Sequence, residues 1–259
     1  MSRRSFQVMA VACLFAGALW AGSDSFVGKW KLNPSRTHLT DQMKIEAAGA
    51  HKYVFDFGGG NLETVVADGT DQPGISGTTL SVTIFGPATW RIVRKKQGRV
   101  LLSAIWKLSP DGKTLTDTFR GNLPDGSMLS VDDVYKRLGP GSGFVGTWET
   151  ENEKVISAYE VQIQLSAGDG LSFITPAEHE TQSMKFDGKD YPAVGPNVPR
   201  GAASSGRRLS THALEITDKI NGSVVATKRI DLSSDLKTLT MTVHRPGHNK
   251  PNILVFDRE

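Results

Sequence analysis

Apolar and polar residues alternate along most of the chain with a period of two, and clusters of Gly, Pro, Asp and Asn interrupt the alternation. This period is typical of β-strands that bury one face, whereas a helix repeats every 3.6 residues. The first half predicts nine strands, at 26–32, 42–47, 52–57, 62–67, 78–85, 89–95, 99–108, 114–119 and 128–136. The second half reads similarly. A short helix is expected only in segments such as 35–43 or 176–185.

The predicted strands are joined by short turn-forming clusters such as Gln97-Gly98 and Pro110-Asp111-Gly112. Short connections make neighbours in sequence into antiparallel neighbours in space. Eight or nine such strands in each half, without disulfides, favour a closed up-and-down barrel over a sandwich. We therefore expect an all-β protein with two tandem antiparallel β-barrels.

Two barrels are expected because the chain repeats itself. Phe26-Val27-Gly28-Lys29-Trp30 returns as Phe144-Val145-Gly146-Thr147-Trp148, and three further segments recur in the same order with small insertions. These pairs are 68–73 with 187–192, 108–116 with 232–240, and 134–137 with 255–258. The pattern indicates a tandem duplication.

The duplication sets the expected domain boundaries. The first barrel is expected at 24–137 and the second at 144–259, with a linker at 138–143. The linker sequence Leu-Gly-Pro-Gly-Ser-Gly suits a flexible joint. The largest difference between the copies is a Gly/Pro-rich polar stretch at 192–206.

Residues 1–22 have the three parts of a secretory signal peptide: Arg3 and Arg4, an apolar stretch at 8–20, and small residues after it. The apolar stretch is too short for a stable membrane span, so we expect an exported protein, periplasmic or secreted, with no integral span after cleavage. Lipidation at Cys13 is the alternative, but the apolar run continues beyond it. Cleavage would remove the only cysteine.

The net charge argues against a nucleic-acid partner. The formal charge is +3, and Arg3 and Arg4 in the signal segment contribute two of these charges. A nearly neutral mature chain lacks the basic footprint of nucleic-acid-binding proteins.

The Gly-x-Trp near the start of each all-β unit resembles the lipocalin and calycin superfamily. This resemblance implies that the motif lies on the first strand, that its Trp plugs one end of the barrel, and that an Arg near the last strand covers the Trp by a cation–π contact. These residues would be structural. The pairs implied are Gly28 and Trp30 with Arg137, and Gly146 and Trp148 with Arg258.

A closer resemblance is to uncharacterised secreted bacterial proteins with Phe-x-Gly-x-Trp-x-Leu-Asn-Pro and Asp-Gly-Lys-Asp-Tyr-Pro motifs. The first copy keeps Leu32-Asn33-Pro34 after its Trp, and the second keeps the Asp-Gly motif at 187–192. No activity comes with this resemblance.

Metal sites are not expected. The Asp-Gly-x-Asp-x-Pro segments resemble part of a Ca²⁺ loop, but neither copy has a regular Asp-x-Asp-x-Asp series, so we interpret them as turns. His244 and His248 have a spacing that occurs in zinc sites. However, Pro246 between them prevents a helix and no third ligand lies near in sequence, which favours an exposed loop.

No set of residues points to catalysis or to a cofactor. The mature chain has no Cys and no Gly-x-Ser-x-Gly elbow. Asp132 and Asp133 are adjacent on a predicted strand and point to opposite faces. We expect solvent exposure for them; the alternative is that one faces the barrel interior. No catalytic residue is assigned, and we expect a protein that is not an enzyme.

Aromatic residues of the first copy are the remaining candidates for a site. Barrels of this size can hold one small molecule, although the same side chains can instead fill the barrel. The candidates for lining an apolar cavity are Phe55, Phe57, Phe85, Trp90 and Trp106. In the second copy, His212 and Ile230 align with the two tryptophans.

These observations lead to two functional hypotheses. The first is an exported binding protein that holds a small hydrophobic ligand in one or both barrels. The alternative is a structural or protein-interaction module with filled barrels. A cavity of roughly 300 Å³ or more, the low end for ligand pockets, would favour the first.

Overall fold

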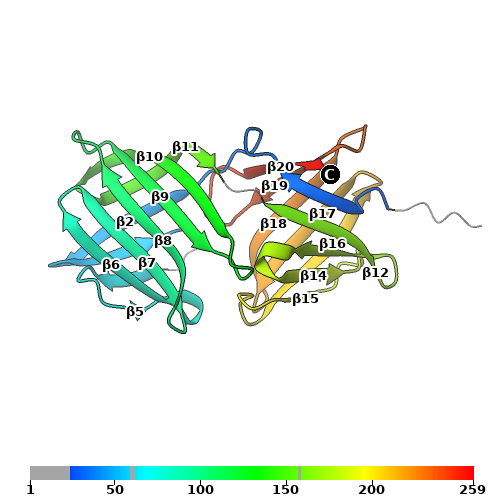
Figure 1. Ribbon diagram of the computed structural model, residues 1–259, viewed down its shortest axis with the longest axis horizontal. Helices are drawn as coiled ribbons and strands as arrows, with labels where there is room; N and C mark the ends of the chain where they lie inside the picture. Colours follow the sequence, from blue (N-terminus) through cyan, green and yellow to red (C-terminus); the bar gives the residue numbers. More distant parts are fainter. Residues whose placement is uncertain (1–23, 59–61, 157–158) are drawn as a thin grey trace, which may run out of the picture.

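The computed structural model describes residues 24–58, 62–156 and 159–259. The expected signal segment, with Cys13, lies outside the described residues. Two antiparallel β-barrels lie side by side, as expected (Figure 1). The described residues contain no α-helix, only 3₁₀ turns at Ile75–Gly77 (η1) and Pro176–Glu178 (η2). The helix considered at 35–43 is therefore absent, and 176–185 contains the turn η2 followed by strand β14 (Glu180–Met184).

The strand order of each barrel follows the chain, with one exception in each. The first barrel is a nearly closed sheet ordered β4 (Leu62–Val66), β3 (Lys52–Asp56), β2 (Gln42–Gly49), β11 (Val145–Val155), β10 (Met128–Ser142), β9 (Thr114–Asn122), β8 (Arg99–Leu108), β7 (Thr89–Lys96), β6 (Thr79–Gly86) and β5 (Gln72–Pro73).

The second barrel is closed. Its order is β1 (Gly28–Leu32), β12 (Glu160–Ser166), β13 (Gly170–Thr175), β14 (Glu180–Met184), β15 (Tyr191–Val194), β16 (Ala202–Ser210), β17 (Ala213–Ile220), β18 (Ser223–Leu232), β19 (Thr238–His244) and β20 (Asn252–Arg258), which pairs again with β1.

The two repeats exchange their first strands. Strand β1, from the first repeat, lies between β12 and β20 of the second barrel, and β11, from the second repeat, lies between β10 and β2 of the first. The two exchanged strands pair with their neighbours in equivalent registers. Trp30 stands opposite Arg258, and Trp148 stands opposite Arg137. Each barrel is thus completed by a strand of the other repeat.

This exchange corrects the expected Trp–Arg pairs. The Arg258 guanidinium lies 4.1 Å from the Trp30 ring centroid, and that of Arg137 lies 4.2 Å from the Trp148 ring. The expected contact exists in both barrels, but each Trp meets the Arg of the other repeat. Arg258 also donates hydrogen bonds to the carbonyls of Ser25, Val27 and Leu236, which fix its position.

The expected linker is also wrong, and it explains the exchange. Residues 138–142 belong to strand β10, which turns back directly into β11 with Ser142 opposite Val145. A connection this short makes the two strands antiparallel neighbours. Strand β11 therefore occupies the place beside β10, and β1 fills the equivalent place beside β20. The ranges 24–137 and 144–259 describe the sequence repeat but not the two barrels.

Glycine is required where each Arg crosses the first strand. Gly28 has φ of +152°, and a Cβ there would lie 2.7 Å from an Arg258 Nη1 atom. Gly146 has φ of +149° and meets Arg137 in the same way. A side chain at either position would displace the guanidinium from its Trp, which accounts for the Gly-x-Trp spacing.

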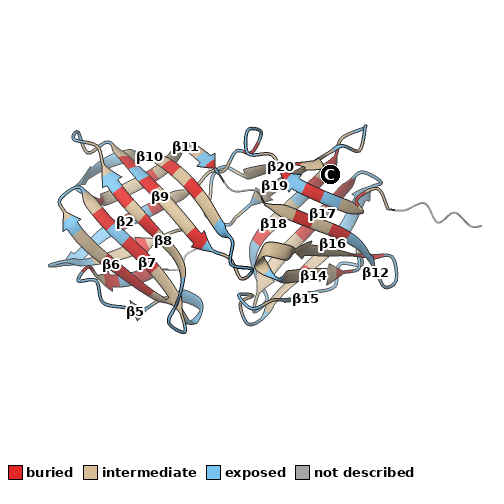
Figure 2. Cartoon of the chain, in the orientation of Figure 1, coloured by how far each residue is buried: buried red, intermediate tan, exposed pale blue. Residues whose placement is uncertain are grey.

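Every second residue along most strands is buried, and the buried side chains form a separate apolar core in each barrel (Figure 2). Trp30 and Trp148 are fully buried, and their indole N–H groups donate to the carbonyls of Phe26 and Phe144 at 2.9 Å. Both indole donors are therefore satisfied, as buried Trp requires.

A buried ion pair spans the gap in the first barrel between β4 and β5. Glu63 on β4 accepts two hydrogen bonds from Arg94 on β7, at 2.9 and 2.6 Å. Glu63 also accepts the Ile75 backbone N–H of the intervening turn at 2.9 Å. This bidentate pair joins strands that the β-ladder leaves unpaired.

A double-mutant cycle tests the exchange. Trp30→Leu and Arg258→Met should show a coupling of about 0.5–2 kcal/mol in the free energy of unfolding, measured by urea denaturation, because a desolvated cation–π contact is lost. Trp30→Leu with Arg137→Met is the matched control and should show coupling near zero. Coupling of Trp30 to Arg137 instead would mean that each first strand stays in its own repeat.

Candidate functional site

The first barrel encloses a cavity of about 350 Å³. Its wall is mainly apolar and includes Met43, Leu80, Ile92, Leu102, Ala104 and Phe119. The volume lies within the range of small-molecule sites. The first barrel is therefore hollow beside its aromatic core.

The five aromatic residues expected in this cavity have three different environments. Phe57 and Trp106 line the cavity, whereas Phe55 and Trp90 are packed in the core, where Trp90 stacks on Phe144 at 4.1 Å. Phe85 is 62% exposed, so its placement in the cavity was wrong. Leu80 and Val82 face inward on β6, and alternation then turns Phe85 outward.

The second barrel encloses a cavity of about 480 Å³. Phe173, Ile216, Met241 and Leu254 contribute to its apolar wall. The two cavities have three lining residues in common, namely Leu39, Val131 and Asn252. The two cavities are therefore separated only by these residues at the junction between the barrels.

Each barrel supplies part of the other's cavity end. Arg245, in the β19–β20 loop of the second barrel, lines the first cavity, and Leu129, at the start of β10, lines the second. The β9–β10 loop reaches the second barrel, where the Asp125 N–H donates to the Ala177 carbonyl at 3.2 Å. The chain between β1 and β2 crosses the junction beside them.

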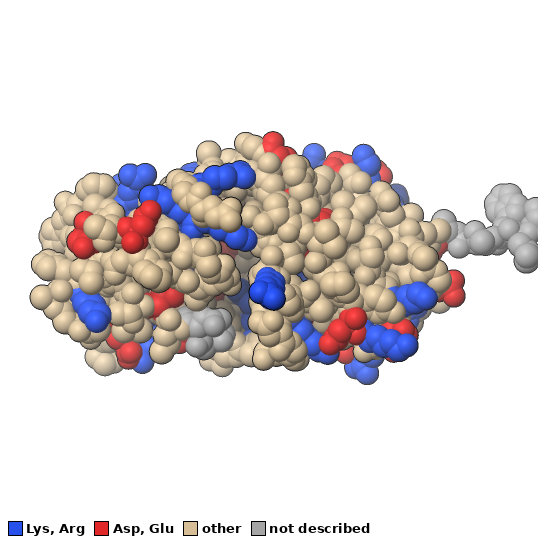
Figure 3. All heavy atoms as spheres, turned by 90° about the horizontal axis from the view of Figure 1, so that it is seen from below, with Lys and Arg blue, Asp and Glu red and all other residues tan. Residues whose placement is uncertain are grey.

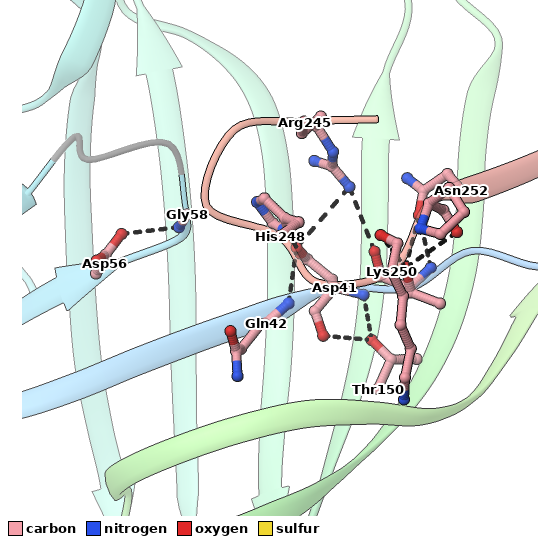
Figure 4. Close-up of polar contacts among 11 residues, drawn as sticks. Asp41, Gln42, Asp56, Gly58, Thr150, Arg245, His248, Lys250 and Asn252 are labelled. Carbon is pink, nitrogen blue, oxygen red and sulfur yellow. Dashed lines mark hydrogen bonds and ion pairs between the residues drawn. The ribbon is translucent and has the colours of Figure 1, made fainter. Parts of the chain in front are cut away.

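Asp41, in this crossing segment, anchors the β19–β20 loop (Figure 4). Its Oδ1 lies 3.7 Å from His248 Nδ1 and 3.9 Å from an Arg245 nitrogen. Its backbone N–H donates to Thr150 Oγ1 on β11 at 2.9 Å. Burial raises the pKa of Asp41, and Arg245, together with His248 when it is protonated, opposes the rise. Burial lowers the pKa of His248. The His248 side chain is only 6% exposed, so the expected exposed loop is wrong at this residue.

Three carboxyl groups form a row across neighbouring strands of the first cavity. Asp117 on β9 stands opposite Asp133 on β10, which stands opposite Glu153 on β11. All three line the cavity. We call these residues the acid row. On its other side Asp117 stands opposite Trp106, so the row continues the aromatic wall.

Burial is the main cause of the raised pKa values of the three carboxyl groups in the acid row. It raises the pKa of Asp117 to about 7, and with the neighbouring Glu153 it raises that of Asp133 to about 8. Burial and the Asp41 charge raise the pKa of Glu153 to about 7. Like charges that share an apolar chamber disfavour ionisation. Near neutral pH the row is therefore divided between protonated and ionised forms.

Several polar atoms of the row lack partners. Asp117 and Asp133 are 7% and 8% exposed, and the Oδ1 atom of each accepts no hydrogen bond. The Trp106 Nε1–H lies near enough to Asp117 to oppose its pKa rise, yet it completes no hydrogen bond. Buried polar groups are normally paired, and unpaired ones are costly.

The second repeat provides an internal comparison for this row. The spacing of the duplicated segments places Ile230, Met241 and Leu254 at the positions of Trp106, Asp117 and Asp133. Ile230 stands opposite Met241, which stands opposite Leu254, and all three line the second cavity. The barrel fold therefore accepts apolar residues at these positions.

The acid row was not predicted from the sequence, although the alternation of apolar residues on β10 indicates that Asp133 faces inward. Val131 and Tyr135 are inward apolar positions on β10, so Asp133 between them faces inward, and exposure was the wrong expectation for it. Asp132 faces outward and pairs with Arg120 at 2.9 Å. Glu153 lies beyond a bulge in the β10–β11 pairing. The bulge shifts the inward and outward alternation of side chains, so the sequence pattern does not show which face Glu153 occupies.

The Asp-Gly motifs form turns, as predicted. Asp68 Oδ1 accepts the Thr70 backbone N–H at 2.8 Å, and Asp187 Oδ1 accepts that of Lys189 at 3.1 Å. The Thr70 hydroxyl also donates to Asp68 Oδ1 at 2.7 Å, and this bond with the backbone bond lowers the pKa of Asp68. The backbone bond from Lys189 lowers the pKa of Asp187. The motifs therefore shape the chain by Asx-type bonds.

The outer surface differs from the first cavity in its charge. Lys and Arg side chains are interspersed with Asp and Glu over both barrels on the face seen in Figure 3.

Across the described part of the chain, no helix is long and apolar enough to span a membrane. Comparison with protein families, curated proteins and solved structures gives no match.

The raised pKa values predict an unusual pH dependence of stability. Between about pH 4 and pH 8 the folded acid row binds more protons than the unfolded chain, so its contribution to the free energy of unfolding falls as pH rises. The stability gain of Asp133→Asn over wild type should grow by on the order of 1–3 kcal/mol between pH 5 and pH 8.5, measured by urea denaturation.

Asp132→Asn is the matched control, because it removes the neighbouring outward carboxylate and should not give this gain. A stability difference between Asp133→Asn and wild type that stays the same from pH 5 to pH 8.5 would contradict the burial of an unpaired carboxylate.

Proposed function

We propose that the protein is a non-enzymatic binding protein that holds a small, largely apolar ligand in one or both barrels. The observation that carries this proposal is the presence of cavities of about 350 and 480 Å³ with apolar walls. Both volumes fall in the range of ligand pockets. Fully packed barrels would have favoured a structural or interaction module.

The proposal includes the relationship and the location expected from sequence. The Gly-x-Trp motif on the first strand and the Arg across its Trp support a lipocalin-like interpretation of the two barrels. Residues 1–22, which resemble a signal peptide, support export to the periplasm or beyond.

Filling each cavity tests the proposal. Wild-type protein should enhance the fluorescence of Nile red, a neutral apolar probe. Ala104→Phe should reduce the signal of the first cavity and Val161→Phe that of the second, because each adds a ring to a lining position. The double variant should lose at least about nine-tenths of the enhancement, at a stability cost of about 1–3 kcal/mol per overpacked site.

Val224→Phe is the matched control, because it adds the same ring to a side chain that is 46% exposed. Circular dichroism would verify that the variants fold. A folded double variant that binds Nile red as tightly as wild type would show that the probe sits elsewhere and would refute the proposal.

A further inference from the structure

We propose that the cavity of the first barrel selects a small protonated amine with an apolar body, and that the acid row of Asp117, Asp133 and Glu153 is the counter-ion for its ammonium group. This inference rests on the proposed function, since it names the class of ligand that one of the two cavities takes. The second cavity has an apolar row at the equivalent positions, and its own carboxyl groups, Glu178, Glu180 and Asp218, lie beside Lys228, which already supplies a cation. It would therefore not share this selectivity.

The first argument is charge. Within the described ranges, no Lys, Arg or His forms an ion pair with any member of the acid row. The basic groups near it have other partners: Arg94 pairs with Glu63, and Arg120 pairs with Asp132 on the outer face. Arg245 lies 3.9 Å from Asp41, and its charge opposes the raised pKa of Glu153 without cancelling it. A buried carboxylate without a counter-ion is strongly disfavoured. A bound cation would supply the missing charge.

The second argument is hydrogen bonding. The Oδ1 atoms of Asp117 and Asp133 are buried, lie at the cavity wall and accept no hydrogen bond. An ammonium group carries up to three N–H donors and no acceptor, so it matches a row of acceptors on neighbouring strands. Bonds between an ammonium and carboxylates are charge-assisted and stronger than neutral ones.

The third argument is the remainder of the wall. Phe57, Trp106, Phe119 and Tyr135 surround the same cavity and offer ring surfaces to an apolar body. Aromatic faces also attract organic cations, most strongly when water is excluded. A small amine with a hydrocarbon or aromatic body would therefore satisfy both the acidic and the apolar parts of the wall.

The fourth argument is the comparison between the repeats. Met241 and Leu254 occupy the positions of Asp117 and Asp133 in a barrel of the same fold. Closure of the barrel therefore does not require carboxyl groups there. Two buried, incompletely paired carboxyl groups lower stability. Their presence in only one cavity is explained by a ligand that differs from the ligand of the other.

The experiment compares three probes matched in size at pH 8 by isothermal titration calorimetry: 2-phenylethylamine, 2-phenylethanol and 3-phenylpropionate. The amine should bind wild-type protein at least about tenfold more tightly than the alcohol, as expected for charge-assisted hydrogen bonds to buried acceptors. The carboxylate should bind more weakly than the alcohol, because it adds a like charge.

Variants then assign the selectivity to the row. Asp133→Asn and Asp117→Met should bring the affinities for amine and alcohol to within about threefold by removing a buried charge, while the alcohol affinity stays close to wild type. Glu180→Gln is the matched control, because it neutralises a carboxyl group that lines the second cavity, and it should leave the amine preference unchanged.

The pH profile provides a readout that a purely structural role would not give. The groups that face the row are Tyr135, Asp41 and Arg245, and Asp132 with Arg120 lie behind it on the outer face. The amine, with a pKa of about 10 like that of Lys, stays protonated while the row ionises, so its preference over the alcohol should rise between pH 6 and 8.5. Asp133→Asn should flatten this rise.

Other outcomes separate this inference from the proposed function. If the amine and the alcohol bind wild-type protein equally, the inference is overturned while the binding-protein proposal stands. If neither they nor Nile red bind, both fail. Displacement of the amine by CaCl₂ at constant ionic strength would identify the row as a metal site and would also overturn the inference.

Discussion

The pairing of barrel edges is the constraint on which the rest of this structure depends. An unpaired edge exposes backbone donors and acceptors, and each barrel pairs the last strand of one repeat, β10 or β20, with the first strand of the other repeat. This pairing closes the second barrel, while the first keeps a gap between β4 and β5. The stacking of Arg258 on Trp30 and of Arg137 on Trp148 locks these strands in place. Neither wall is complete within one repeat, so the two barrels form one interdependent unit.

The exchange also builds the site. Strand β11 brings Glu153 beside Asp133, so the second repeat supplies the third carboxyl group of the first cavity. The equivalent strand β1 ends at Leu32 and adds no such residue to the second barrel. The crossing segment that follows β1 carries Leu39 into both cavities and Asp41 against the β19–β20 loop. The exchange of first strands therefore contributes both to the acid row and to the ends of the two cavities.

The two repeats have diverged at one row of the cavity wall. The turns, the Gly-x-Trp strands and the Arg residues keep equivalent positions and contacts. The wall row, in contrast, is Trp106, Asp117 and Asp133 in one barrel and Ile230, Met241 and Leu254 in the other. Two barrels with the same Trp–Arg contact therefore present chambers that differ at this row, which in the first chamber carries two buried carboxyl oxygens without hydrogen-bond donors.

The sequence by itself determined the strands, the turns, the duplication and the closing Trp and Arg residues, because these depend on local alternation and local hydrogen bonds. The period-two alternation also carried the inward direction of Asp133 and the outward direction of Phe85, although we expected the opposite for both residues. Only the tertiary structure decided which repeat completes which barrel, since both first strands carry the same motif and fit either place. It also decided the position of Glu153, because the bulge on β11 changes which face that residue occupies.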